Sequence, residues 1–399
     1  MPGRGGWQVT GDRTSRDDGR TLGWRRGPRP PEARDLCRGD SFRDGQAVTT
    51  DTISVAADLS ILSGLSYACR PECGLCCYAE PLVAPAERPA LVQIAPEAAF
   101  VTRGRFQFLR SHPDGGACHL LESNRCRAHA ARPSLCREFP LTAHVGVRVQ
   151  VTAVLTCPGV DLSWLRDYRG PEREPPPMGF EVELAALLAR LDGGIRRRLE
   201  TNGRRYRRIE RVLSTKGRWL GEAEARSSLR DRLPMPDDQD FPAEDPPSRQ
   251  EGLDLLPLFH DGPSGPVAIA SHPGGWELLE LYSAGGVRRS LGVAPPPDRP
   301  PDLSNDAART LAGYLRYWLE RDQLFGVVHL GMLGDDEGSV VDRSGAELRR
   351  IAATTLSRAY VLATVRRGTV DQLSEGDVRE GIRATDQDLL DRATWGVKL

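Results

Sequence analysis

The chain has 399 residues, a hydrophobic fraction of 39%, a charged fraction of 27% and a formal net charge of −1. This length accommodates two or three domains, and the composition is typical of a soluble globular protein. A net charge so close to zero excludes a chain-wide attraction to polyanions, so we expect neither nucleic acid nor a membrane as a partner.

Residues 1–48 are rich in glycine, arginine and aspartate and contain little apolar sequence. We expect this segment to be disordered, because it cannot offset the entropy of ordering. It does not resemble a secretory signal, and the chain has no apolar run long enough for a transmembrane helix. We therefore expect a cytoplasmic protein, in which clustered cysteines indicate metal or redox chemistry more often than disulfides.

Residues 49–160 contain the cysteine cluster and two predicted elements. Pro96 is suited to a helix start, which predicts a short helix over Glu97–Arg110. From Val145 to Leu155, valines and other apolar residues alternate with their neighbours, and this period of two predicts a β-strand. The strand would return Cys157 to the first cysteines and close the module.

Residues 161–232 form a predicted helical extension. Apolar residues at helical spacing indicate a short helix near Trp164–Tyr168 and longer helices over Phe180–Leu191 and Arg204–Leu213. The last of these carries many arginines on its polar side, which we interpret as a solvated face. Residues 233–250 are acidic and proline-rich, as is typical of a linker.

Residues 251–399 form a predicted C-terminal α+β domain of unknown role. A hairpin is expected from two apolar segments around His272–Gly275, and Ser304 or Asn305 is a candidate helix cap. The expected elements are strands at Pro266–Ala270 and Trp276–Tyr282, helices at Asp306–Asp322 and Ala346–Arg366, and small closing helices at Val370–Leu373 and Leu389–Leu390. The predicted fold class is therefore α+β: a small cysteine-rich metal-binding module, a helical extension and an α+β C-terminal domain.

Eight of the nine cysteines lie in one stretch, and Cys37 is the exception. Thiolates are soft ligands that suit zinc and iron–sulfur clusters, and the tight C-x-x-C turn brings two sulfurs toward one centre. We take all eight as the metal-ligand pool: Cys69, Cys73, Cys76, Cys77, Cys118, Cys126, Cys136 and Cys157. The spacing does not choose between an iron–sulfur cluster and a four-thiolate zinc site. Adjacent residues point in different directions, so the pair Cys76–Cys77 leaves the number of ligating sulfurs open.

Four histidines and two arginines accompany these cysteines. Of His112, His119, His129 and His144, we rank His129 first as a nitrogen ligand. Arg132 and Arg137 are expected to balance the negative charge of several thiolates.

The cysteine pattern resembles the YkgJ-type cysteine-cluster family, described as zinc- or iron-chelating. The resemblance covers roughly residues 60–160. It rests on Tyr67-Ala-Cys69 through Cys76-Cys77, on Cys118 to Cys126, on the run Arg132-Pro-Ser-Leu-Cys-Arg-Glu-Phe-Pro140, and on Cys157-Pro-Gly159.

This resemblance implies metal binding, with a [4Fe–4S] cluster or zinc as the cofactor. The family includes flagellin lysine N-methylases, which implies an alternative role as a cluster-dependent, S-adenosylmethionine-dependent methyltransferase with a protein substrate. No glycine-rich fingerprint of a Rossmann-type methyltransferase follows a predicted strand, and the run from Gly331 to Asp336 is the nearest. A third alternative is a structural metal clip on a protein-interaction module. The catalytic residues and the oligomeric state are not predicted.

Overall fold

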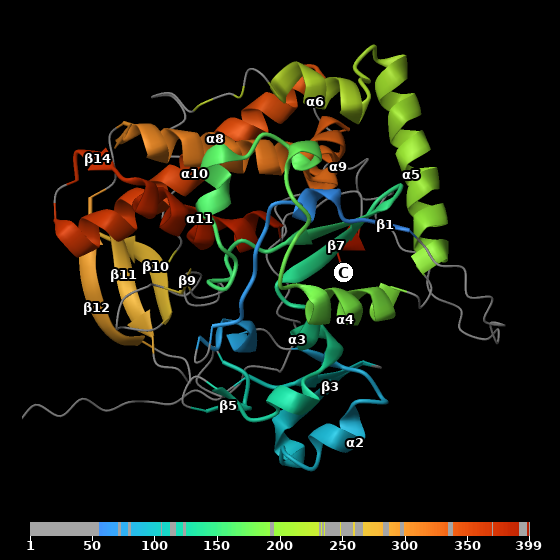
Figure 1. Ribbon diagram of the computed structural model, residues 1–399, viewed down its shortest axis with the longest axis vertical. Coiled ribbons are helices and arrows are strands. Elements are labelled where there is room, and N and C mark those ends of the chain that lie inside the picture. The colour runs from blue at the N-terminus through green and yellow to red at the C-terminus, as the bar shows by residue number, and fades with distance from the viewer. Residues whose placement is uncertain are drawn as a thin grey trace, which may run out of the picture.

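The computed structural model describes residues 56–70, 73–78, 81–104, 106–111, 117–122, 125–191, 195–230, 233, 235, 248, 258–259, 266–281, 287–295, 299–333, 338–368, 370–390 and 397–398. The predicted disordered segment, Cys37, His112 and most of the predicted linker lie outside the described residues. Figure 1 shows helices at one end of the molecule, a β-sheet at their side and a small cysteine-bearing lobe at the other end. The predicted α+β class is confirmed.

Four helices of the C-terminal region form the helical layer. They are α8 (Asn305–Glu320), α9 (Asp322–Met332), α10 (Val340–Arg367) and α11 (Glu375–Leu390). The Oγ atom of Ser304 accepts a hydrogen bond from the Ala307 backbone N at 3.2 Å, which confirms the predicted cap. Ser339 and Asp342 form a reciprocal capping box, so α10 begins before the predicted helix start.

One prediction for this region is wrong, and a second is right in kind but too short. Residues 372–373 form β14 (Gln372–Leu373), which pairs with β13 (Asp302–Leu303), in place of a closing helix. The expected helix at 389–390 is the end of the much longer α11, whose buried side chains include Val378, Ile382 and Leu389. The apolar run before Gly331 is helix α9, so the sequence that comes nearest to a Rossmann-type fingerprint does not follow a strand.

A four-stranded sheet lies between these helices and the cysteine lobe, with strand order β1-β8-β7-β15. Its strands are β1 (Ala57–Asp58), β7 (Leu141–Val145), β8 (Val149–Ala153) and β15 (Val397–Lys398). Both faces of β7 and β8 are buried. The prediction of one strand over 145–155 is therefore wrong in part. The chain turns at 146–148 into a hairpin, in which the Gly146 backbone N donates to the Arg148 carbonyl at 2.9 Å and the Arg148 side chain pairs with Asp58 and Asp322.

The cysteine lobe is built from short elements around its own small core. They are the 3₁₀ helix η2 (Leu75–Tyr78), β2 (Leu82–Val83), α2 (Arg88–Leu91), η3 (Glu97–Ala99), β3 (Phe100–Arg103), β4 (Phe106–Leu109), β5 (Leu121–Glu122), β6 (Arg125–Cys126), η4 (His129–Ala131) and α3 (Ser134–Glu138). The predicted helix over 97–110 is wrong. Gly104 adopts a left-handed φ of 61° and turns the chain between β3 and β4, whose aromatic and β-branched residues favour strands.

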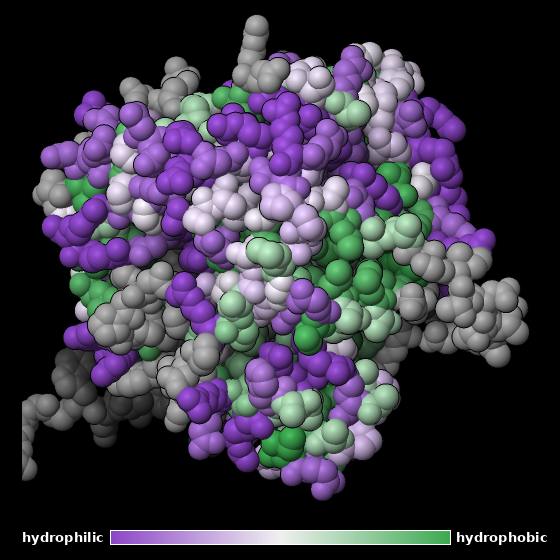
Figure 2. All heavy atoms as spheres, in the orientation of Figure 1, coloured by the Kyte–Doolittle hydropathy of each residue, from purple (hydrophilic) through white to green (hydrophobic). Residues whose placement is uncertain are grey.

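The predicted helical extension is confirmed as η5 (Ser163–Asp167), η6 (Pro171–Arg173), α4 (Glu181–Leu191), α5 (Ile195–Thr215) and α6 (Glu222–Arg230). Ile209 and Leu213 on α5 are buried, whereas Arg204 and Arg208 are exposed on the other side, as expected for a solvated arginine face. Hydrophilic residues line the outer edge of the molecule along α5 in Figure 2.

A second sheet, with strand order β12-β11-β10-β9, packs against α10 and α11. The predicted hairpin is present as β10 (Pro266–His272) and β11 (Gly275–Leu281). Two further strands, β9 (Leu258–Phe259) and β12 (Val287–Ala294), were not predicted.

The largest hydrophobic core is shared by residues from three of the predicted segments. It joins Leu141 and Val151 of the central sheet, Leu187 of α4, and Leu311 and Ile382 of the C-terminal helices. The predicted boundaries at residues 160 and 250 stay predictions, but the sheet that precedes Cys157 packs directly on the C-terminal helices. In the described part of the chain, none of the helices combines the length and the apolar character that a membrane crossing requires.

Candidate metal centre

The two ends of the cysteine segment lie side by side. The Ala68 backbone N donates to the Gly159 carbonyl at 3.0 Å, and Tyr67 forms an antiparallel bridge with Val160. A Cβ added to Gly159 would lie 2.6 Å from the Ala68 carbonyl oxygen, so this close approach requires glycine. The prediction that the chain after the strand returns Cys157 to the first cysteines is confirmed.

The cysteines between these ends are placed by local turns and short strands. Gly74 has a φ of 61°, and the Cys77 backbone N donates to its carbonyl at 2.9 Å, which forms the C-x-x-C turn. The Cys118 backbone N donates to the Cys77 carbonyl at 2.5 Å. Cys126 lies on β6 opposite Leu121, and the single turn of α3 contains Cys136.

The Cys77 thiol has one S–H, which can donate to the sulfur of either Cys76 or Cys126. Its hydrogen bond lowers the pKa of Cys76, and the positive charge of Arg132 acts in the same direction. Donation from Cys77 to Cys126 instead lowers the pKa of Cys126, to about 6. Donation to either neighbour raises the pKa of Cys77 itself. The adjacent pair Cys76–Cys77 therefore contains one thiol that favours the thiolate and one that acts as its donor.

The charge of Cys76 also affects the pKa values of three other cysteines, Cys73, Cys136 and Cys157. Burial raises the pKa of Cys136 well above its usual range, and the nearby thiols of Cys76, Cys118 and Cys126 add to this effect. Burial raises the pKa of Cys157 to about 12, and Cys73 and Cys76 contribute to that rise. Burial likewise raises the pKa of Cys73, with contributions from Cys76 and Cys69. All eight cysteines thus belong to one electrostatically connected group.

The connected thiols lie at different depths. Cys77, Cys118 and Cys157 are buried, whereas Cys69 is exposed. All eight are free, so the described cysteines form no disulfides. As they stand, no three Cys, His, Asp or Glu side chains in the described ranges are arranged to hold a metal ion.

The predicted arginines have different partners. Arg132 lowers the pKa of Cys76 and Cys126 by its charge, as expected for an arginine that balances thiolates. Arg137 instead pairs with Glu87 at 3.3 Å.

The described histidines of the module are dispersed. His129 is exposed, and the charge of Arg132 lowers its pKa. His144 is buried on β7, where burial lowers its pKa to about 4, and His119 follows directly after Cys118. A nitrogen ligand from this set stays a prediction.

Residues 68–158 match the model of the CxxCxxCC family, which is described as a putative zinc- or iron-chelating domain. This segment is a CxxCxxCC domain. All eight clustered cysteines fall within it, and the match covers about a quarter of the chain. No curated protein and no solved structure matches the chain.

Two residues outside the CxxCxxCC domain complete the surroundings of the thiols and were missed in the sequence. Glu183 of α4 accepts a hydrogen bond from the Tyr67 hydroxyl, and burial raises the pKa of this carboxyl. Its position at helical spacing from the buried Leu187 and Leu191 was a signal that could have revealed it. Arg383 of α11 donates to the carbonyl oxygens of Cys157 and Val160 at 2.5 and 3.0 Å. No local pattern indicates this contact, because 226 residues separate Arg383 from Cys157.

Proposed function

We propose that the CxxCxxCC domain holds an iron–sulfur cluster, with ligands drawn from Cys69, Cys73, Cys76, Cys77, Cys118, Cys126, Cys136 and Cys157. The observation that carries this proposal is that the segment matching a zinc- or iron-chelating domain contains all eight cysteines and is folded back on itself, with backbone bonds from Ala68 to Gly159 and from Cys118 to Cys77. An iron–sulfur cluster is held by thiolates and supplies one-electron redox chemistry when bound.

The chemistry of the donor set supports this assignment. The set consists of sulfur atoms, which favour iron–sulfur clusters and zinc over magnesium or calcium. Arg132 places a fixed positive charge beside the thiols that it helps to deprotonate. Metal binding releases the protons of its thiol ligands, so a low thiol pKa lowers the free-energy cost of loading.

The number of thiols exceeds the four that one cluster needs, and their environments suggest different duties. Cys76 and Cys126 have lowered pKa values, whereas the single S–H of Cys77 can donate to either of them. We therefore expect Cys76 and Cys126 to lose their protons most readily when metal binds. Cys77, whose pKa is raised, is the thiol that we expect to keep its proton longest.

The test is metal analysis of protein purified without oxygen. The protein is expected to be brown, to contain iron and acid-labile sulfide, and to lose visible absorbance on reduction. Cys76→Ser should lose the iron, whereas Cys37→Ser, outside the proposed ligand pool, should retain it. A colourless protein with stoichiometric zinc would contradict the iron–sulfur assignment and leave a thiolate zinc site.

Protein methylation stays a separate prediction. Calorimetric titration of the iron-loaded protein with S-adenosylmethionine is its direct test, and failure to bind would contradict it without affecting the metal assignment.

A further inference from the structure

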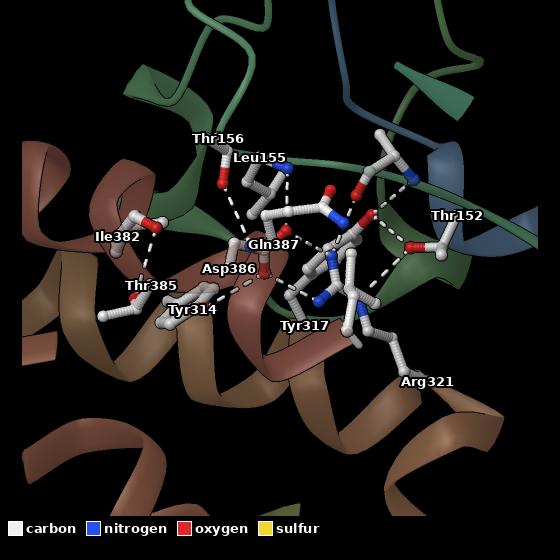
Figure 3. Close-up of polar contacts among 12 residues, drawn as sticks. Thr152, Leu155, Thr156, Tyr314, Tyr317, Arg321, Ile382, Thr385, Asp386 and Gln387 are labelled. Atoms are coloured by element: carbon white, nitrogen blue, oxygen red, sulfur yellow. Dashed lines mark hydrogen bonds and ion pairs between the residues drawn. The ribbon is translucent and has the colours of Figure 1, made fainter. Parts of the chain in front are cut away.

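The segment that leads into Cys157 and leaves it is held by the C-terminal helices at several backbone positions. Asp386 accepts from the Leu155 backbone N at 2.7 Å, and the Gln387 backbone N donates to the Thr156 hydroxyl at 3.0 Å. Arg383 donates to the Cys157 and Val160 carbonyls. Figure 3 shows Asp386 and Gln387 facing Leu155 and Thr156 from α11.

These contacts come from one face of a single helix. The side chains of residues 383 and 386 lie three positions apart and share a face of α11, and the backbone N of residue 387 adjoins that face. The helix therefore contacts the loop around Cys157 as one rigid surface, and the loop cannot move without breaking several of these bonds.

A buried ion pair fixes the register of α11. Arg321, at the junction of α8 and α9, bonds Asp386 at 2.7 and 3.1 Å, and both side chains are fully buried. The same guanidinium donates to the Thr152 hydroxyl at 3.1 Å and to the Ala153 carbonyl at 2.9 Å. It also stacks over Tyr317, with 4.6 Å from its central carbon to the ring centroid. Sliding α11 along its axis would leave two buried charges unpaired.

We propose that α11 is a positioning element of the metal centre and that Arg383 sets the place of the Cys157 sulfur by holding the carbonyls on both sides of its turn. The inference rests on the proposed function for the identity of the bound group, but not for the position of Cys157. It gives the C-terminal region a role: the region completes the thiol site from outside the CxxCxxCC domain.

Arginine suits this role better than lysine. Two of its nitrogens reach the Cys157 and Val160 carbonyls at once, and their fixed planar geometry defines the distance between the two acceptors. The turn itself has one backbone bond, from the Val160 N to the Cys157 carbonyl at 3.1 Å. The Gly159 carbonyl is held separately by the Ala68 backbone N. Removing the guanidinium therefore frees the Cys157 end of the turn, which Ala68 does not reach.

The first experiment measures cobalt binding, with Co²⁺ alone as the probe. Arg383→Met is expected to weaken cobalt affinity by about 10- to 100-fold, the usual effect of losing a residue that orients a metal ligand. It should also weaken the thiolate-to-cobalt absorption band. Arg383→Lys should restore part of the affinity. Arg379→Met is the matched control, because Arg379 lies one turn earlier on α11 and pairs with Glu375. Wild-type affinity in Arg383→Met would overturn the proposal.

The second experiment needs no metal. Alkylation of the metal-free protein, followed by mass spectrometry, reports how accessible the buried Cys157 becomes relative to Cys118. Arg383→Met should accelerate labelling of Cys157 severalfold and leave Cys118 unchanged, whereas equal acceleration at both would show general loosening and overturn the positioning role. If the wild-type chain bound neither cobalt nor iron but Cys157 still responded selectively, the proposed function would fail and the positioning role would stand.

Discussion

Replacing Asp386 by alanine should destabilise the protein more than replacing any exposed charged residue does. Asp386 accepts four hydrogen bonds: two from Arg321, one from the Tyr314 hydroxyl at 3.0 Å and one from the Leu155 backbone N. The substitution leaves a fully buried guanidinium without its counter-charge. Removing one partner of a buried pair costs about 3–5 kcal/mol. That is a large part of the roughly 5–15 kcal/mol by which domains are stable.

The assay is urea unfolding of metal-free protein, followed by tryptophan fluorescence and circular dichroism. Asp306→Ala is the control, because its ion pair with Arg309 is half exposed and such pairs contribute about 0–1 kcal/mol. The double variant Arg321→Met/Asp386→Leu should recover part of the loss, since it leaves no buried charge but still removes the acceptor of the Tyr314 hydroxyl and the Leu155 backbone N. A loss below about 1 kcal/mol for Asp386→Ala would refute the assignment of this pair as the anchor of α11.

Three further predictions concern the turn at Cys157, acid stability and metal linkage. Gly159→Ala should cost about 1–3 kcal/mol in urea unfolding, because its Cβ would press on Ala68, whereas Gly331→Ala meets nothing within 4 Å and should not destabilise. Burial lowers the pKa of His329 to about 4, so on acidification this histidine is protonated in the unfolded chain at a higher pH than in the folded protein. The contribution of His329 to stability should thus fall by about 3 kcal/mol between pH 6.5 and 4 and stay constant above that window. His329→Phe should remove this part of the pH dependence. If the free energy of unfolding fell with pH as steeply in the variant as in the wild type, the prediction would be contradicted. Metal at 100 times its Kd should raise the free energy of unfolding by about 2.7 kcal/mol. Circular dichroism should then show one thermal transition at a higher temperature, whereas two separate transitions would count against a shared core.

Because the core is shared, removing a structural metal is expected to affect more of the chain than the cysteine lobe. If the bound metal acted as a local staple, its removal would unfold the cysteine lobe alone. Leu141 and Val151 of the central sheet pack in the same core as Leu311 and Ile382, so loss of order around Cys157 is expected to reach the C-terminal helices. The linkage experiment therefore tests the architecture as well as the metal.

The sequence by itself determined the metal-binding segment and most of the longer helices. Thiolate chemistry and close spacing act locally, so the C-x-x-C turn and the eight cysteines could be recognised without a fold. The cap at Ser304 and the apolar stripes of α4, α5, α8 and α10 are also local signals.

Only the tertiary structure showed which distant residues contact that segment. Arg148, in the turn between β7 and β8, pairs with Asp322, which lies 174 residues later. The helix predicted at 97–110 is a hairpin because its aromatic residues pair across strands, an interaction that helical spacing does not reveal. Arg383 and Asp386 reach the Cys157 segment from more than 220 residues away. Such contacts depend on which surfaces the core brings together, and no local pattern of residues encodes them.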